Sequence, residues 1–156
     1  MESCVIQTPL GSTTITGNIN GISSVSLSDK SLEETVIPES LKACVQQLGE
    51  YFQGTRHEFE LKLNPEGTDF QKRVWKALLQ VPYGKTKTYL ELSRTIGDAK
   101  AIRAVAAANG KNPLWIIVPC HRIIGSDGSL VGYAGGLGRK KWLLNHESAV
   151  RQVSLF

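Results

Sequence analysis

A thiol and an imidazole stand on consecutive residues, Cys120 and His121, within the stretch VPCHRII at 118–124. A thiolate is a soft nucleophile, and a neutral imidazole can accept the thiol proton. Extended backbone would point neighbouring side chains to opposite faces, so the pair predicts proton transfer through a bound water. Glu147 in the later stretch NHE is the candidate that orients the imidazole. The alternative is a buried structural cysteine, but two polar residues directly after an apolar run favour chemistry.

The elements that must position this pair begin with a region of strand character. Residues 3–28 mix small polar and β-branched residues around the turn NING, which predicts short antiparallel strands. Apolar residues at helical spacing then follow between Ser40, a candidate N-cap, and Gly54, a candidate stop. This part therefore predicts a small sheet with one helix.

The stretch LNPEG at 63–67 carries Pro and Gly breakers and marks the expected domain boundary. We predict an α+β fold. A small N-terminal antiparallel β-sheet domain with a helix occupies residues 1–65. A mostly helical C-terminal domain with a helix-turn-helix and the active-site cysteine occupies residues 66–156.

Two capping boxes mark helix starts in the second half of the chain. Thr68 with Gln71 opens one helix, and Thr88 with Glu91 opens another, which stops at Gly97. Asp98 can cap a third helix over 99–109. Two short helices joined by a tight turn form a helix-turn-helix candidate.

Arg103 stands alone among alanines on this third predicted helix. Small side chains allow a helix to approach a surface closely, and the long cation then projects beyond them. The alternative is an ordinary surface ion pair. After this helix, WIIV at 115–118 is expected to be a buried extended segment that ends at Pro119, just before Cys120.

Charge is distributed unevenly along the chain. Residues 1–65 carry four basic and eight acidic residues, a net −4, whereas residues 66–156 carry fourteen basic and six acidic residues, a net +8. A basic second half predicts a polyanionic partner, although a solvated basic face would give the same count. No stretch has the roughly 20 apolar residues of a membrane span. Three scattered cysteines without a CxxC pair suit free thiols in a reducing compartment, so we expect a cytoplasmic protein, or a nuclear one in a eukaryote.

VPCHRII, together with NP upstream, KTYLEL ahead and GYAGGLGRKKWLLNHE downstream, resembles the O6-alkylguanine-DNA alkyltransferases, the methylated-DNA–protein-cysteine methyltransferases. The resemblance runs from about Phe70 to Glu147. It implies direct repair, in which an alkyl group moves irreversibly from O6 of guanine in double-stranded DNA to Cys120. O4-alkylthymine is a further candidate substrate. Because the product is a thioether, each molecule should act once.

The resemblance also implies the roles of individual residues. Cys120 is the acceptor, His121 activates it through a water, and Glu147 orients the imidazole. Asn112 braces the turn before the cysteine, and the phenol of Tyr89 hydrogen-bonds the departing base.

On the DNA side, the resemblance implies that Arg103 fills the space left by the flipped nucleotide while the helix-turn-helix lies in the minor groove. The expected DNA contacts are Tyr89, Lys100, Arg103, Ala104, Asn109 and Gly110. The expected base contacts are the carbonyls of Val118 and Cys120, backbone N–H groups at Tyr133 and Ala134, and the ring of Trp115.

Trp115 departs from the resemblance, because many relatives carry Pro or a small residue there. We expect its ring to exclude bulky alkyl groups. We expect no cofactor and no metal, since Cys4, Cys44 and His57 lack motif spacing. We also expect the chain to act as a monomer and to have no membrane partner. Two rival functions stay open: a non-enzymatic sensor of DNA damage, and a cysteine hydrolase that uses Cys120, His121 and Glu147.

Overall fold

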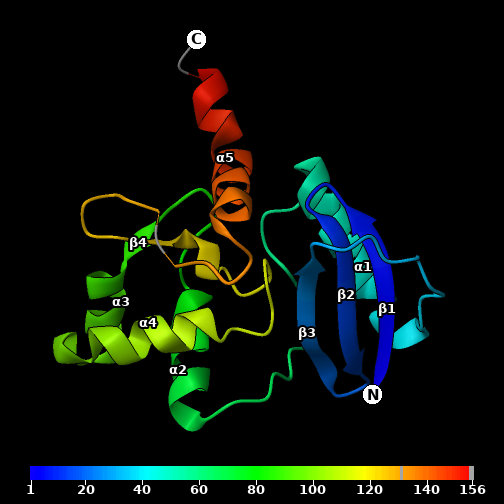
Figure 1. The fold of residues 1–156 in the computed structure, drawn as a ribbon, viewed down its shortest axis with the longest axis horizontal. Coiled ribbons are helices and arrows are strands. Elements are labelled where there is room, and N and C mark those ends of the chain that lie inside the picture. The colour runs from blue at the N-terminus through cyan, green and yellow to red at the C-terminus, as the bar shows by residue number, and fades with distance from the viewer. Residues whose placement is uncertain (131, 155–156) are drawn as a thin grey trace. The chain divides into compact units, whose positions relative to one another are not determined.

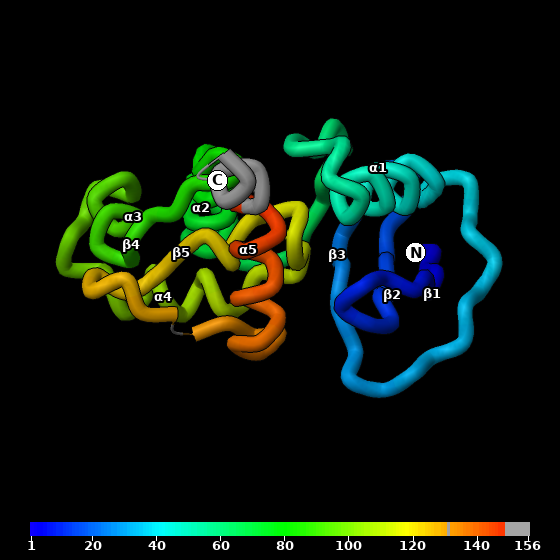
Figure 2. The backbone as a smooth tube through the Cα atoms, turned by 90° about the horizontal axis from the view of Figure 1, so that it is seen from above, coloured from blue at the N-terminus to red at the C-terminus, as the bar shows by residue number. Residues whose placement is uncertain are grey.

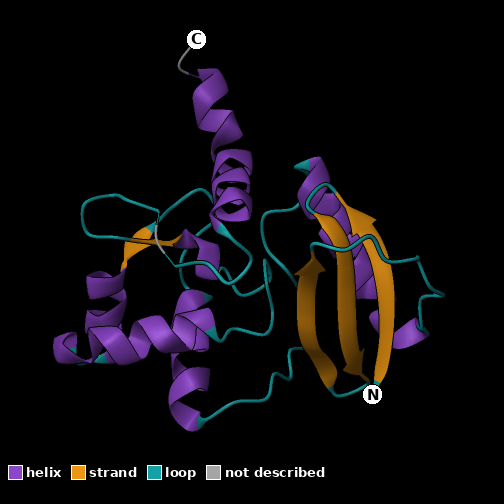
Figure 3. Ribbon diagram, in the orientation of Figure 1, coloured by secondary structure: helices purple, strands orange, loops and turns teal. Residues whose placement is uncertain are grey.

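The computed structural model describes residues 1–130 and 132–154, which form two compact units. The first unit comprises Met1–Glu66 together with Pro113–Ile117. The second comprises Gly67–Asn112 and Val118–Phe156. Long strands belong to the first unit, and the second is mostly helical (Figure 3). This arrangement confirms the predicted α+β fold. In the described part of the chain, no helix is long and apolar enough to cross a membrane.

The first unit contains an antiparallel sheet in the order β1-β2-β3, formed by Glu2–Thr8, Gly11–Asn18 and Gly21–Ser28 (Figure 1). Cys4 pairs with Ile15 and Ile15 pairs with Val25, so all three side chains share one face. Each is at most 1% exposed. The alternation of small polar and β-branched residues therefore predicted the antiparallel strands correctly, and their pairing places these three residues on one buried face.

Helix α1, Lys42–Gln53, contributes Cys44, Leu48 and Tyr51 to the core of this unit. The predicted stop at Gly54 is confirmed, since this residue ends the helix at φ 84° in the left-handed region. The predicted N-cap at Ser40 is wrong. A 3₁₀ turn, Glu39–Leu41, precedes the helix, and the Ser40 hydroxyl donates instead to the carboxylate of Glu2 at 2.6 Å.

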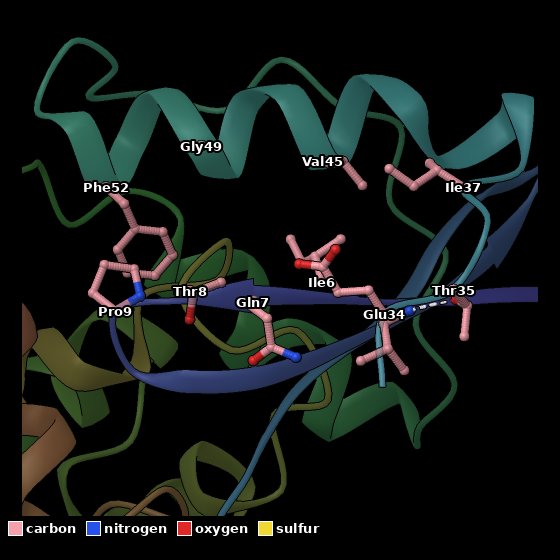
Figure 4. Close-up of a pocket in the computed structure, with 11 residues that line it drawn as sticks. Ile6, Gln7, Thr8, Pro9, Glu34, Thr35, Ile37, Val45, Gly49 and Phe52 are labelled. Atoms are coloured by element: carbon pink, nitrogen blue, oxygen red, sulfur yellow. Dashed lines mark hydrogen bonds between the residues drawn. The ribbon is translucent and has the colours of Figure 1, made fainter. Parts of the chain in front are cut away.

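After β3, residues 29–38 run without regular structure around the sheet and return to α1 (Figure 2). Thr35 anchors this segment to β1, because the Val5 N–H donates to its hydroxyl at 2.9 Å. A groove lies between β1, this segment and α1, and none of the predicted site residues lines it (Figure 4). Its lining residues are Val5, Ile6, Gln7, Thr8, Pro9, Glu34, Thr35, Ile37, Val45, Gly49 and Phe52.

The segment Pro113–Ile117 extends the sheet at a single position. Val25 donates to the Pro113 carbonyl at 2.9 Å and accepts from the Trp115 N–H at 3.1 Å. The chain then turns, with the Ile117 N–H bonded to the Trp115 carbonyl at 2.9 Å. The intervening Ile116 has φ 75°, the geometry of a strained three-residue turn.

The expected extended segment at 115–118 is therefore wrong. Ile116 and Ile117 are 1% and 4% exposed, so the apolar run correctly predicted that this segment is buried. Burial comes from packing rather than from a strand ladder, and an apolar run of four residues does not distinguish the two.

The second unit consists mainly of α2 (Asp69–Leu78), α3 (Tyr89–Ile96), α4 (Ile102–Gly110) and α5 (Leu137–Ser154). Two short parallel strands, β4 (Lys87–Thr88) and β5 (Ile123–Ile124), pair beside the cysteine segment. Both predicted capping boxes are confirmed, each with its reciprocal pair of hydrogen bonds.

Helices α3 and α4 form the predicted helix-turn-helix. Gly97 ends α3 at φ 104°, and the Asp98 side chain accepts from the Lys100 N–H at 2.8 Å. The expected helix over 99–109 is corrected in one respect: residues 99–101 form a 3₁₀ turn, and the α-helix begins at Ile102. Trp75 of α2 connects this helix to α4, because its indole N–H donates to the Ala108 carbonyl at 2.8 Å.

Candidate active site

Cys120, His121 and Arg122 form a 3₁₀ turn rather than the end of a strand. The Cys120 N–H bonds to the Val118 carbonyl at 2.8 Å across Pro119, whose φ and ψ are −81° and 62°. Successive residues of a 3₁₀ turn are rotated by about 120°, so neighbouring side chains diverge without facing opposite ways. The strand geometry expected for Cys120 and His121 is therefore wrong. Proline has no backbone N–H, and the turn requires no N–H donor at position 119.

The thiol of Cys120 is only 3% exposed. Burial raises its pKa to about 11, while a hydrogen bond from the Asn112 side chain and the positive charge of Lys140 act in the opposite direction. Asn112 also donates to the Val118 carbonyl at 2.8 Å, so one side-chain amide hydrogen-bonds both the backbone before the turn and the Cys120 sulfur. At neutral pH this environment keeps the resting group protonated, and nucleophilic chemistry requires a base to remove the proton.

His121 and Glu147 meet inside the second unit, with the imidazole Nε2 2.7 Å from Glu147 Oε2. Both side chains are at most 1% exposed. Burial lowers the pKa of His121, opposed by its contact with Glu147, so the ring is neutral at physiological pH. Burial would raise the pKa of Glu147, but the hydrogen bond from His121 and the hydrogen bonds and positive charge of Arg122 hold it well below its usual range.

This pairing fixes the tautomer of the imidazole. An ionised Glu147 only accepts, so Nε2 of His121 carries the proton and Nδ1 keeps its lone pair. Nδ1 is buried and has no hydrogen-bond partner among the described residues. The arrangement therefore presents a neutral base one residue from a thiol.

Arg122 and Lys140 are buried cations that the sequence did not single out for a role. Arg122 holds Glu147 with two bonds of 2.8 and 3.0 Å, donates to the Val81 carbonyl at 2.7 Å and lies over the ring of Tyr83. Lys140 is 0% exposed and donates to the Ile123 carbonyl.

Both cations had a signal in the sequence. Arg122 is polar directly after an apolar run. Lys140, Leu143 and Glu147 follow helical spacing on α5, and all three are buried, so Lys140 belongs to the inward face of this helix.

Tyr89 opens α3 and is half-buried. Its hydroxyl donates to the Gly132 carbonyl at 3.3 Å. Burial and the negative charge of the Cys120 thiolate raise the pKa of this phenol, and a hydrogen bond from Asn109 opposes them. The phenol therefore belongs to the same electrostatic environment as the sulfur.

The expected DNA contacts divide by exposure. Lys100, Arg103, Ala104 and Gly110 are exposed on the helix-turn-helix, and Arg103 is in no ion pair with any residue that the structure describes. Asn109 differs, because it is 2% exposed and its side chain meets Tyr89.

The residues expected to contact the base are divided between the two units. Trp115 lies in Pro113–Ile117 of the first unit, whereas Val118, Tyr133 and Ala134 lie in the second. The Val118 carbonyl already accepts from Asn112 and Cys120. A further donor would have to share these lone pairs. Tyr133 and Ala134 form a turn in which the Gly136 N–H bonds to the Tyr133 carbonyl at 3.0 Å.

The three side chains considered for a metal do not share one environment. Cys4 and Cys44 are buried and His57 is exposed. Over residues 1–130 and 132–154, no group of three or more His, Cys, Asp or Glu residues could hold a metal ion.

Comparison with known proteins matches two family models. The DNA-binding domain of 6-O-methylguanine DNA methyltransferase matches residues 69–149, and the ribonuclease-like domain of the same enzyme matches residues 3–65. A methylated-DNA–protein-cysteine methyltransferase of Methanosarcina barkeri is 46% identical over 150 residues, which cover 92% of this chain and 94% of the relative.

Solved structures agree. The crystal structure of O6-methylguanine methyltransferase from Mycobacterium tuberculosis has a TM-score of 0.84 at 44% identity, covering 93% of this chain and 91% of that one. A crystal structure of a protein from the same organism in complex with DNA has a TM-score of 0.88 at 43% identity, covering 96% of this chain and 94% of that one. The chain belongs to the O6-methylguanine DNA methyltransferase family.

Proposed function

We propose that the chain repairs DNA by transferring an alkyl group from O6 of guanine to Sγ of its own Cys120. As a member of this family it is a methylated-DNA–protein-cysteine methyltransferase. Transfer is a displacement at saturated carbon: a C–S bond forms while the C–O6 bond breaks, and the guanine anion leaves. The proton lost by the thiol balances the proton that the purine regains. Because a thioether offers no activated carbonyl to water, the reaction occurs once per molecule.

The observation that carries the proposal is the fixed tautomer of His121. Glu147, which Arg122 holds in place, keeps Nδ1 of the imidazole unprotonated, one residue along the chain from a thiol that burial keeps protonated. In our proposal Nδ1 accepts the Cys120 proton through a bridging water, and the Tyr89 hydroxyl donates a hydrogen bond to the leaving base.

The partner in this proposal is double-stranded DNA that carries O6-alkylguanine, with O4-alkylthymine as a further candidate. The exposed alanine-rich face of α4 approaches the minor groove, and Arg103 occupies the space left by the flipped nucleotide. The freedom of Arg103 from ion pairs with described residues supports this role. We also propose that the chain acts as a monomer in the cytoplasm, or in the nucleus of a eukaryote, where its three free thiols would stay reduced.

The test is stoichiometric transfer of labelled methyl from an O6-methylguanine duplex to protein. We expect one methyl per wild-type molecule, none for Cys120→Ser, and an unchanged yield for Cys44→Ala, which removes a buried thiol elsewhere. Cys120→Ser should still bind the duplex, because the thiol contacts no phosphate in our proposal. Repeated turnover, or labelling of Cys120→Ser, would contradict the proposal.

A further inference from the structure

Asn109 is a buried amide in the last turn of α4. It is 2% exposed, whereas its neighbours Ala107 and Gly110 are exposed. Its side chain donates a hydrogen bond to the phenol oxygen of Tyr89, a contact that lowers the pKa of the phenol against the effect of burial. The helix proposed to meet DNA is thus bonded directly to the phenol proposed to meet the base.

The second bond of the phenol is weak. Tyr89 Oη donates to the Gly132 carbonyl at 3.3 Å, longer than the usual upper limit of about 3.0 Å for O–H···O. A methyl group added at Gly132 would come within 3.2 Å of the same oxygen. The phenol therefore accepts a hydrogen bond from Asn109, while its own proton points to a distant acceptor and can be redirected to a closer one.

Asn109 contributes little to stability in this position. Its Oδ1 is buried and has no hydrogen-bond partner within the described residues. An unsatisfied buried acceptor costs at least as much stability as one hydrogen bond contributes. The two effects offset each other or leave a net cost, so an apolar residue of similar size would be at least as stable. A reason for an amide must come from the reaction.

We infer that Asn109 is a positioning residue that acts through Tyr89. Donation to the phenol oxygen fixes the direction of the O–H and polarises it, which makes it a stronger donor to the departing purine. This inference rests on the proposed function, because it assigns Asn109 to the step in which guanine leaves.

A double-mutant cycle tests the inference. Single-turnover methyl transfer is measured at saturating O6-methylguanine duplex for the wild type, Asn109→Leu, Tyr89→Phe and the double variant. Asn109→Leu should slow transfer about 3- to 10-fold, the worth of one neutral hydrogen bond, without weakening DNA binding. In the Tyr89→Phe background the same change should cost less than about 2-fold, because the phenol oxygen is already absent.

Stability separates positioning from structural damage. Asn109→Leu should keep the melting temperature of the wild type within a few degrees, and Asn109→Ala provides a smaller variant if Leu prevents folding. Ser93→Ala is the matched control, because Ser93 is buried and donates to the Tyr89 backbone carbonyl at 2.9 Å rather than to the phenol. It should keep the wild-type transfer rate.

Equal rate losses in both backgrounds, or a loss in DNA affinity alone, would overturn the inference. Failure of the wild type to transfer methyl would instead overturn the proposed function.

Discussion

Glu147→Gln should destabilise the second unit far more than an ordinary loss of a surface charge. The Glu147 carboxylate is 1% exposed and accepts three bonds, from His121 at 2.7 Å and from Arg122 at 2.8 and 3.0 Å. An amide keeps the shape but turns one acceptor into a donor that faces other donors. It also leaves the buried guanidinium without a counter-charge.

Removing one partner of a buried ion pair costs about 3–5 kcal/mol. We place Glu147→Gln near 3 kcal/mol, because Arg122 keeps its bond to the Val81 carbonyl and the amide can still accept once. The assay is urea unfolding at neutral pH, followed by the fluorescence of Trp75 and Trp142 in the second unit.

Glu50→Gln is the matched control for this substitution. Glu50 also pairs with an arginine, Arg56, at 2.8 Å, but the two side chains are 33% and 24% exposed. Exposed pairs contribute little, so the control should unfold close to the wild type. Equal, small effects of the two substitutions would refute the reasoning that Glu147 neutralises a buried cation.

Three further predictions test other parts of the site. Because burial depresses the pKa of His121 below its unfolded value of about 6.5, its contribution to stability is present above that pH and lost below it. The unfolding free energy should therefore fall as the pH is lowered below about 6.5, with a slope that reaches at most about 1.4 kcal/mol per pH unit from this one group, and His121→Gln should flatten the slope; a wild-type profile flat from pH 7 to pH 5 would contradict it. Arg103→Ala should slow transfer more on duplex than on single-stranded O6-methylguanine DNA, since extruding a stacked base costs a few kcal/mol that a free strand avoids; equal fractional losses would reduce Arg103 to a phosphate contact. Trp115→Ala should raise the rate for O6-benzylguanine relative to O6-methylguanine, and a lower relative rate would mean that the ring stacks on the benzyl group instead of excluding it.

Local signals in the sequence predicted many of the helix ends and the strands of the fold. Capping boxes and left-handed glycines act within a few residues, so the starts of α2 and α3 and the ends of α1 and α3 were predictable. Alternating residues predicted the short antiparallel strands of the N-terminal sheet, but not their number. Ser40 shows the limit, because Glu2, distant in the chain, takes its hydroxyl and a 3₁₀ turn starts the helix instead.

The turn that carries Cys120 was not predictable from local pattern. Ile116 adopts φ 75° in the middle of an apolar run, a conformation that a β-branched residue rarely takes and that the surrounding packing must enforce. The meeting of His121 with Glu147 followed from the chemistry of the pair. Arg122 and Asn109 acquire their contacts only in the folded unit, where Glu147 and Tyr89 come from distant parts of the chain.

The central claim is that Cys120 itself receives the alkyl group. Its most direct test is peptide mass spectrometry of the protein after incubation with an O6-methylguanine duplex and removal of the DNA. We predict a permanent gain of one methyl group on the peptide that contains Cys120, with the Cys4 and Cys44 peptides unchanged and the duplex restored to guanine. An unmodified Cys120 on a protein that still binds the duplex would identify a damage sensor, and either that result or a methyl group on another residue would contradict the account.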